Sequence, residues 1–367
     1  MKKEGLMSRR GGGVKVYVFS LRTQFENAGD LLINAAAVAW LSRHSRVYCL
    51  GRGVPQYYAD AFISAVTTYG NVSNIRILNE RLITTIALWP VRYGIGKAVY
   101  VQKPGHYTGA YSFRSFVLYF VHAILMLWIK LWGAEIYRMP SSMQPAVGIF
   151  GLLTAFHSRL CDKLFVRDGR SLEILEAWGC RADLAPDLAH FYFSTSGKQT
   201  RLRAKRDPVM VTIVPRAKNV DAYWSQLIER IQTKTNQDAR IKIVSQVFFD
   251  SELCDQLADS CGLDHFRLSE EKFSIEKLFD VYKSVNYVIS DRLHALLAGR
   301  LSGACPVMPK LASEKVLGYF DTWFRRENEC ELDECGIGAV YLITDRRMVE
   351  LKGVLELALS RAIKTCE

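Results

Sequence analysis

The sequence predicts an α/β protein with two Rossmann-like domains that face each other across a cleft. Short apolar runs alternate with helix-length segments along nearly the whole chain, which is typical of parallel sheets covered by helices. The alternation stops once, at the polar and basic stretch 193–208, and then resumes. The length of 367 residues also fits two domains of about 150 to 200 residues better than one.

Residues 1–195 are expected to form the N-terminal domain. Its strands are expected at the apolar runs 14–20, 46–50, 75–78, 98–102, 134–139 and 163–166. Its helices are expected at 30–43, 56–68, 113–132, 148–160 and 169–178. The strand at 75–78 is followed by an apolar stretch to which we assign no element. Continuous apolar strands that alternate with helices predict a parallel, doubly wound sheet.

Residues 196–208 are expected to be a basic linker, and residues 209–345 a C-terminal domain. Strands are expected at 209–214, 241–245, near 266, and at 287–290 and 305–308. Helices are expected at 220–234, 249–259, 273–283, 291–302 and 313–324. The final segment, 346–367, is expected to carry one amphipathic helix.

Composition and charge narrow the classes of protein and partner. Hydrophobic residues make up 49% of the chain and charged residues 23%, as in globular proteins with sizeable cores. The formal net charge of +11 favours an anionic partner: nucleic acid, a membrane surface, a phosphorylated substrate or an acidic polysaccharide. The basic residues are scattered and match no zinc-finger, RNP or basic-zipper pattern, so we expect no nucleic-acid partner.

The cysteines and the chain start predict a cytoplasmic protein. Nine cysteines form no CxxC pair, and their odd number suits reduced thiols better than a disulfide framework. No histidine lies near the closest pair, Cys330 and Cys335, so we expect no metal site there. The first apolar run, 14–21, is interrupted by Lys15 and predicts a strand rather than a signal peptide.

The segment 116–132 is the one candidate for a membrane helix. Its uncharged core, 116–129, would span about 21 Å as a helix, which is shorter than the roughly 30 Å of a bilayer core. We therefore expect a core helix or one that lies on a membrane surface. The protein is expected free in the cytoplasm or at the inner face of the cell membrane.

A polar turn at 290–294 joins an apolar strand to a helix. It places Arg292 and His294 where a helix exposes unpaired N–H groups and a partial positive charge. Such a turn can bind an anion, and a guanidinium suits phosphate or carboxylate. The imidazole of His294 can exchange a proton near neutral pH. The residues leave a second interpretation open, in which Asp291 caps the helix, Arg292 lies on the surface and His294 fills space.

Two other strand-to-helix turns resemble this one. Asn-Ala-Gly-Asp at 27–30 precedes an Ala-rich helix, and Arg216 directly follows the first strand of the second half. With Arg292, Arg216 would hold a small anion from two sides. Alone, 27–30 is equally an N-cap with a permissive glycine, and Arg216 a surface residue. GxGxxG is absent, so a dinucleotide site is not supported.

Together these stretches resemble the polysaccharide pyruvyltransferase family. The family's Asn-x-Gly-Asp turn is found here at 27–30, and its Ser-x-Arg-Leu-His-Ala turn at 290–295. Its proline strand follows at 305–308, and its lysine-bearing helix at 314–315. The segment 164–187 is similar to the family's Val-Arg-Asp/Glu…Ser…Gly…Pro-Asp segment and matches at Arg167, Ser171, Gly179, Pro186 and Asp187. The resemblance covers residues 14–325 in outline.

The resemblance implies a GT-B-like fold and an enzyme that transfers the enolpyruvyl carbons of phosphoenolpyruvate onto two hydroxyls of a sugar. The product is a cyclic pyruvate ketal, and phosphate is released. Phosphoenolpyruvate is the donor substrate, and neither a further cofactor nor a metal is implied. The acceptor is a polysaccharide or an oligosaccharide precursor, with or without a lipid carrier.

The resemblance also implies that the N-terminal domain lies on the acceptor side of the cleft and the C-terminal domain on the phosphoenolpyruvate side. It further implies roles for individual residues. His294 is the expected acid, and phosphoenolpyruvate is expected to bind Arg216, Arg292 and the amides of Leu293 and His294. Asp30 is expected to accept a proton from the sugar hydroxyl or to orient it. The residues expected to bind the acceptor are Asn27, His106, Ser142 and Gln144.

Two segments depart from the family pattern. The glycine-rich turn after the strand near residue 100 is replaced by QKPGHYTGAY at 102–111, and the Ser-Ile-Gly-Pro element is Ser-Met-Gln-Pro at 142–145. Both are expected to border the acceptor pocket, so the acceptor sugar stays open.

Two other functions stay open. One is a GT-B glycosyltransferase that uses a nucleotide sugar, with Glu314 as the carboxylate that contacts ribose. The other is a non-catalytic protein that binds polysaccharide or a lipid carrier, which would tolerate the loss of His294.

Overall fold

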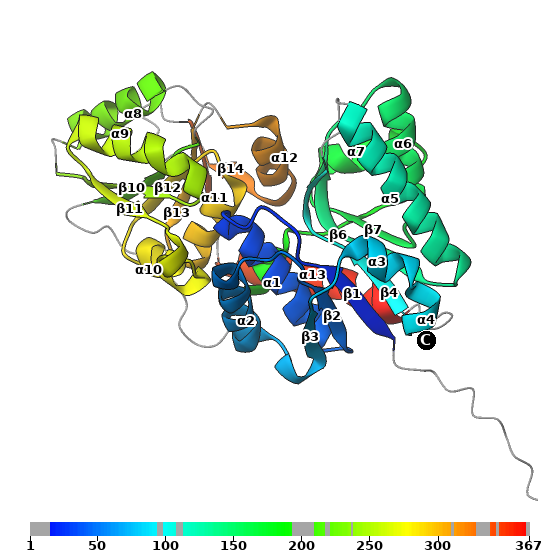
Figure 1. Ribbon diagram of the computed structural model, residues 1–367. Coiled ribbons are helices and arrows are strands. Elements are labelled where there is room, and N and C mark those ends of the chain that lie inside the picture. The colour runs from blue at the N-terminus through cyan, green and yellow to red at the C-terminus, as the bar shows by residue number, and fades with distance from the viewer. Residues whose placement is uncertain are drawn as a thin grey trace, which may run out of the picture.

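The computed structural model has two sheets, each covered by helices, and confirms the expected α/β class with two Rossmann-like domains (Figure 1). It describes residues 15–93, 98–107, 113–192, 209–216, 221–235, 238–309, 312–327, 338–342 and 345–364. The basic linker expected at 196–208 lies outside these ranges.

The first sheet has the strand order β3-β2-β1-β4-β6-β7-β8, with β5 paired to β6, and all these pairings are parallel. Its strands are β1 Val16–Ser20, β2 Val47–Leu50, β3 Ile75–Leu78, β4 Ala98–Gln102, β5 Gly105–Tyr107, β6 Glu135–Met143, β7 Lys163–Val166 and β8 Asp183–Leu184. Its helices are α1 Ala28–Ser42, α2 Gln56–Tyr69, α3 Leu82–Ala87, α4 Trp89–Tyr93, α5 Phe113–Leu131, α6 Gly148–Arg159 and α7 Gly169–Ala177, with 3₁₀ turns η1 Val72–Asn74 and η2 Leu188–Tyr192.

The second sheet has the order β11-β10-β9-β12-β13-β15-β14, in which β15 runs antiparallel to both of its neighbours, β13 and β14, and the other pairings are parallel. Its strands are β9 Met210–Val214, β10 Arg240–Ser245, β11 Asp264–Arg267, β12 Tyr287–Ser290, β13 Cys305–Pro309, β14 Arg325–Glu327 and β15 Gly338–Leu342. Its helices are α8 Asp221–Lys234, α9 Ser251–Cys261, α10 Ile275–Lys283, α11 Leu293–Leu301, α12 Glu314–Trp323 and α13 Asp345–Lys364, with turns η3 Phe248–Asp250 and η4 Glu270–Lys272.

The main differences from the expected elements lie at ends and edges. α1 begins at Ala28 rather than at residue 30, because Asn27 is its N-cap and accepts a hydrogen bond from the amide of Gly29. The unassigned apolar stretch after β3 forms α3 and α4. The strands β5, β8, β14 and β15 were not expected, because their short runs lack the apolar continuity of buried parallel strands.

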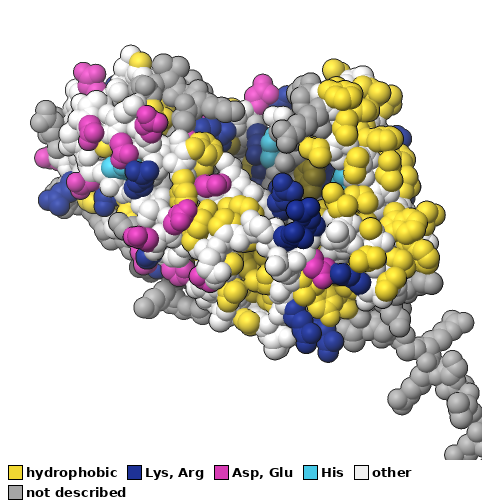
Figure 2. Space-filling view, viewed as in Figure 1, with side chains coloured by type: hydrophobic (Ala, Val, Ile, Leu, Met, Phe, Trp, Pro, Cys, Tyr) yellow, Lys and Arg dark blue, Asp and Glu magenta, His cyan; other side chains and the backbone are white. Residues whose placement is uncertain are grey.

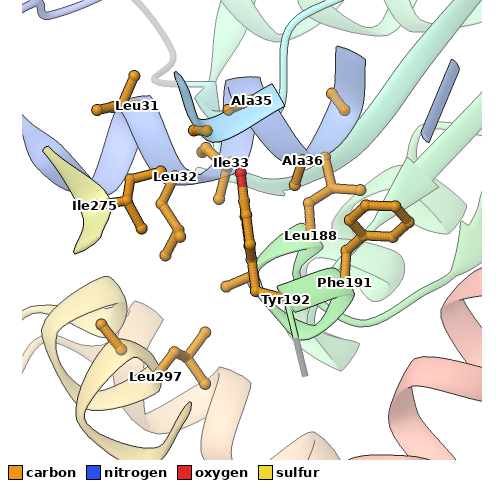
Figure 3. Packing of buried hydrophobic residues seen from close by; sticks show 14 of the residues in the cluster. Leu31, Leu32, Ile33, Ala35, Ala36, Leu188, Phe191, Tyr192, Ile275 and Leu297 are labelled. Atoms are coloured by element: carbon orange, nitrogen blue, oxygen red, sulfur yellow. The ribbon is translucent and has the colours of Figure 1, made fainter. Parts of the chain in front are cut away.

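The core joins the two halves of the molecule. One face of the first sheet packs under α1, while the opposite face contributes Val18 and Tyr100 to a separate cluster under α3 to α5. Leu32 of α1, Phe191 of η2 and Leu297 of α11 belong to one buried cluster that spans both sheets (Figure 3). The two halves therefore share one hydrophobic cluster, beside smaller clusters that are confined to each half.

The last helix, α13, packs against η2 of the first half, although the chain has just left the second sheet. Its residues Met348, Leu351 and Leu355 are buried in the shared cluster. The C-terminal helix thus ties the second half of the chain back to the first.

The direction of strand order reverses at the same place in both sheets. β1 pairs with β2 on one side and with β4 on the other, and β9 pairs with β10 and with β12. In doubly wound sheets, ligands bind beyond the carboxyl ends of the strands at this reversal. The loops that follow β1, β4, β9 and β12 are therefore expected to line the ligand-binding site.

Candidate active site

The turn after β12 presents a helix N-terminus toward the first half. The Ser290 hydroxyl accepts a hydrogen bond from the amide of Arg292 at 3.0 Å and donates to the carbonyl of Val214 at 2.8 Å. α11 then begins at Leu293, with Arg292 as N-cap and no side chain capping the helix. Asp291 does not cap the helix, so the first-turn amides keep their donor capacity and their partial positive charge.

His294 lies where the N-termini of α1 and α11 meet. Its Nε2 is 3.4 Å from Asp187 Oδ2 and 3.4 Å from Arg167 Nη1, and the side chain is 14% exposed. A Cβ atom on Gly29 would lie 2.6 Å from His294 Nδ1, which is closer than real contacts allow. Gly29 has no positive φ angle, so its backbone conformation does not require glycine. The missing side chain instead leaves room for the imidazole of His294 to pack against α1.

Behind His294 lies a buried ion pair between Arg167 and Asp187. Arg167 Nη1 is 2.5 Å from Asp187 Oδ2, and both side chains are 1% exposed. Burial alone would raise the pKa of Asp187, but His294 and Arg167 outweigh it and hold this pKa well below its usual range. The carboxylate therefore stays ionised and can fix the orientation of the imidazole.

Four cationic side chains line a small cavity of about 110 Å³ in front of His294. Three are arginines with a nearby carboxylate: Arg167 with Asp187, Arg292 with Asp250, and Arg216 Nε 3.7 Å from Asp291 Oδ2. The fourth cation is Lys315. We call this space the small cavity; it is strongly electropositive toward any bound group.

Lys315 differs from the three arginines because no ion pair or hydrogen bond holds its ammonium group among the described residues. Burial, together with the positive charges of Arg167 and Arg216, lowers the pKa of Lys315 to about 7. An anion in the small cavity would restore its charge. Lys315 is the cation most available to a ligand.

Gln246 points to a polar ligand in the same cavity. It follows β10, is 1% exposed, and lines the small cavity. Neither its Oε1 nor its Nε2 has a hydrogen-bond partner among the described residues. Buried amides without partners are rare, so this side chain is suited to bind an atom of the ligand.

Asp30 lines the small cavity from the N-terminus of α1. Its Oδ2 accepts a hydrogen bond from Thr23 Oγ1 at 2.5 Å, and its Oδ1 accepts from Asn27 Nδ2 at 3.2 Å. Asn27 also caps α1 through its Oδ1, 2.9 Å from the amide of Gly29. Asn27 thus both caps the helix and orients the carboxylate of Asp30.

A wide cavity of about 500 Å³ adjoins the small one and shares His106, Arg216 and Lys315 with it. Gln144 and Ser142 line the wide cavity. Burial lowers the pKa of His106 to about 4, with further contributions from Lys315 and Arg167. His106 is therefore neutral near pH 7 and can both donate and accept hydrogen bonds.

Ser142 is less available than expected for an acceptor ligand. The side chain is 2% exposed, its hydroxyl donates to Asp168 Oδ2 at 2.6 Å, and it accepts from Arg167 Nε at 2.8 Å. Its hydrogen-bonding capacity is used within the protein. The contacts make Ser142 a positioning residue for Arg167.

All the residues expected from the sequence line one or both cavities: Asn27, Asp30, His106, Ser142, Gln144, Arg216, Arg292, Leu293 and His294. Sequence reasoning gave no role to Lys315, Arg167 or Gln246. Lys315 and Arg167 stand in segments that carry the family resemblance, so a signal for them was present. Gln246 carries none. In the part of the chain that the structure describes, no group of three or more His, Cys, Asp or Glu could hold a metal ion.

Solved structures with a similar fold include a glycosyltransferase and an epimerase. A glycosyltransferase from Rickettsia africae has a TM-score of 0.54 and 10% identity, covering 97% of this chain and 98% of its own. UDP-GlcNAc 2-epimerase from Neisseria meningitidis, bound to UDP-GlcNAc, has a TM-score of 0.51 and 10% identity, covering 95% of this chain and 98% of its own. At such identity these similarities show the two-domain fold alone.

No curated protein matches the chain in sequence. The family model described as polysaccharide pyruvyl transferase, in contrast, matches residues 27–359. This match includes the turns at both helix N-termini and every residue of the two cavities named above. The chain belongs to the polysaccharide pyruvyl transferase family.

Proposed function

We propose that this member of a polysaccharide-modifying transferase family transfers the enolpyruvyl group of phosphoenolpyruvate to two hydroxyls of a saccharide. The products are a cyclic pyruvate ketal and inorganic phosphate. The observation that carries the proposal is the small cavity, where His294 stands among four cations at a helix N-terminus.

The donor is proposed to occupy the small cavity. Phosphoenolpyruvate carries a phosphate and a carboxylate, and Arg216, Arg292 and Lys315 offer cations to both. The first-turn amides of Leu293 and His294 add donors and the positive end of the helix dipole. Gln246 supplies an amide that has no partner among the described residues.

His294 is proposed to protonate the methylene carbon of the donor, which becomes the methyl group of the ketal. The Asp187 carboxylate, 3.4 Å from Nε2, orients the imidazole. Positive charge then develops at the adjacent carbon, which a sugar hydroxyl attacks. A second hydroxyl displaces the phosphate. Of the two hydroxyl protons lost, one restores His294 and the other leaves with the phosphate, so the step is balanced.

The acceptor is proposed to enter through the wide cavity. Its larger volume of about 500 Å³ suits a sugar ring, and the neutral His106 and the amide of Gln144 suit hydroxyl groups. Asp30, which lines the small cavity, would take the first proton from the attacking hydroxyl or orient that hydroxyl.

Donor binding is tested by thermal unfolding with millimolar phosphoenolpyruvate, beside UDP-, GDP- and CMP-sugars. Stabilisation by phosphoenolpyruvate alone is expected, because a ligand of the folded state raises the melting temperature with its occupancy. Arg292→Ala is a poor probe, since it removes an ion-pair partner of the fully buried Asp250. Lys315→Met breaks no ion pair and should abolish the shift. Stabilisation by a nucleotide sugar instead would support a glycosyltransferase.

The chemical step is tested with His294→Gln. Phosphate release from phosphoenolpyruvate would be followed with a panel of methyl hexosides and N-acetylhexosaminides, and the ketal methyl group detected by NMR. Turnover should fall by at least about 100-fold, the usual scale for a general acid, with phosphoenolpyruvate stabilisation retained. Turnover like that of the unchanged protein would exclude His294 as the acid.

A further inference from the structure

The helices α3 to α6 expose an unusually large set of apolar side chains. Among the described residues, 16 of the 23 exposed large hydrophobic side chains lie on or next to these helices. They are Ile83, Leu88, Val91, Phe113, Val117, Leu118, Phe120, Val121, Ile124, Leu127, Trp128, Leu131, Val147, Ile149, Leu152 and Phe156. We call this set the apolar face; much of it is the yellow region on the right of Figure 2, over α5 and α6 of Figure 1.

The apolar face is one continuous surface because its helices pack side by side. α5 contacts α3 on one side and α6 on the other. α5 buries Ala123, Met126 and Ile129, and the last two pack in the cluster of β1, β4 and β6. Its opposite side carries Leu118, at 61% exposed, and Ile124, at 50%. Exposed apolar surfaces of this extent mark interaction sites.

Charge around the apolar face is mainly positive, and the carboxylates of Glu80 and Asp162 beside it are paired with Arg92 of α4 and Lys130 of α5. The sequences of α3, α4, α5 and α6 contain no aspartate or glutamate. Arg22, Arg52 and Arg81 are exposed and line a cavity of about 630 Å³ together with Leu118 and other residues of α5. Figure 2 shows Lys and Arg side chains along the border of the yellow region. An apolar surface with a basic border complements an anionic lipid surface.

No described helix is long and apolar enough to cross a membrane. We propose that the apolar face docks onto an anionic bilayer, with α5 lying in the plane of the interface and the bordering arginines among the lipid headgroups. The proposal stands on this surface alone and does not depend on the donor or on ketal chemistry.

The apolar face lies next to the candidate active site, so docking would bring that site close to the bilayer. A cavity of about 480 Å³ beside α5 is lined by Leu118, Tyr119, Thr23 and Tyr107, among others. Thr23 donates its hydrogen bond to Asp30, and Tyr107 follows His106. Docking would therefore hold the acceptor side of the site next to the bilayer.

Vesicle flotation tests the proposal. The full chain would be mixed with phosphatidylcholine vesicles that contain either no phosphatidylglycerol or about 30% of it, which gives a clearly negative surface, at low and at high salt. The test variant is Ile149→Ser/Leu152→Ser, whose side chains are 61% and 74% exposed. The matched control is Phe249→Ser/Leu357→Ser, at 58% and 53% exposed and outside the apolar face.

Binding to the anionic vesicles is expected, weakened by salt, reduced at least about tenfold in the test variant and unchanged in the control. Equal melting temperatures of both variants would show that folding is intact. Absence of binding to either vesicle, or equal binding by test and control variants, would overturn the proposal. So would a stable dimer in sedimentation that the test variant alone dissociates, because the face would then join two copies of the chain.

Discussion

At the scale of single residues, the cations of the small cavity fall into two kinds. Arg167 and Arg292 are paired with buried carboxylates, so their charge is largely balanced within the protein. Lys315 has no such pair, and burial together with two neighbouring arginines lowers its pKa to about 7. The ammonium charge is unfavourable without a ligand and becomes favourable when an anion binds. The lysine therefore lowers the stability of the ligand-free protein and raises its affinity for an anion.

Lys315→Met is predicted to stabilise the ligand-free protein and to weaken phosphoenolpyruvate binding about 10- to 100-fold. In the unfolded chain the lysine titrates near 10.5 and in the folded chain near 7, so the unfolded state binds more protons between these values. The penalty is therefore full below pH 7 and declines toward pH 10.5. Melting curves at about pH 6 and about pH 9, which lie below and above the folded pKa, should show the larger gain at the lower pH. A variant less stable than the original at the lower pH would contradict this account.

Gly29→Ala is predicted to displace His294 and to lower turnover by at least about tenfold. The new Cβ would lie 2.6 Å from His294 Nδ1, and overpacking of this kind typically costs about 1–3 kcal/mol. Gly318→Ala is the control, because a Cβ in that helix meets no atom within 4 Å. The control should gain about 0.5–1 kcal/mol of stability and keep its turnover. Phosphate-release kinetics and thermal melts measure both.

At the scale of elements, β6, β7 and α7 hold Arg167 in place. Ser142 of β6 connects Arg167, which directly follows β7, to Asp168, the N-cap of α7. Asp168 in turn accepts from the amide of Ser171 at 2.8 Å. The position of the guanidinium beside His294 therefore depends on a strand end and a helix cap acting together.

Ser142→Ala is predicted to destabilise the protein by about 1–3 kcal/mol, because Arg167 and Asp168 each lose a buried hydrogen-bond partner. It should also raise the KM for phosphoenolpyruvate, since Arg167 lines the small cavity, where the donor is proposed to bind. The neighbouring control is Ser141→Ala, whose hydroxyl makes only a long contact of 3.4 Å to the carbonyl of Phe165. Denaturant unfolding and steady-state kinetics check both variants. Equal effects at the two positions would show that the network does not position Arg167.

At the scale of the whole molecule, the two sheets are joined by the shared cluster and by contacts of α12. The hydroxyl of Thr322 accepts from the amide of Gly169 at 2.9 Å, and Trp323 Nε1 donates to the carbonyl of Arg167 at 2.7 Å. The strand ends that carry the candidate site are therefore held against each other by packing on both sides. Figure 2 shows the hollow that is left between the halves.

We predict that the protein unfolds in one cooperative transition, because separating the halves would expose the shared core. Ile228 lies in a cluster confined to the second sheet, and Leu297 lies in the shared cluster, so Ile228→Ala and Leu297→Ala test the two regions separately. Each should cost about 2–5 kcal/mol and move the single transition to lower temperature. Calorimetric and van't Hoff enthalpies should agree. Two transitions, with Ile228→Ala moving only one of them, would mean that the halves unfold independently.

Most elements and site positions could be predicted from the sequence because the signals are local. Apolar runs predicted the strands of both sheets apart from the short β5, β8, β14 and β15, and the turn at 27–30 predicted an N-cap that the structure confirms at Asn27. The residues after β1, β9 and β12 were expected at one cleft because parallel strands end together at the reversal of strand order. The short antiparallel strands β14 and β15 were missed, since they carry too few residues for a clear period.

The sequence by itself thus determined the alternation of strands and helices, the family and the polar residues at the strand ends. The tertiary structure alone decided that His294 meets Gly29, that Gln246 and Lys315 line the small cavity, and that Ser142 turns inward to Arg167. It also decided that α13 packs on the first half. Each of these contacts joins segments far apart in the chain, so its geometry depends on how two sheets pack around a shared core, which no local pattern of residues encodes.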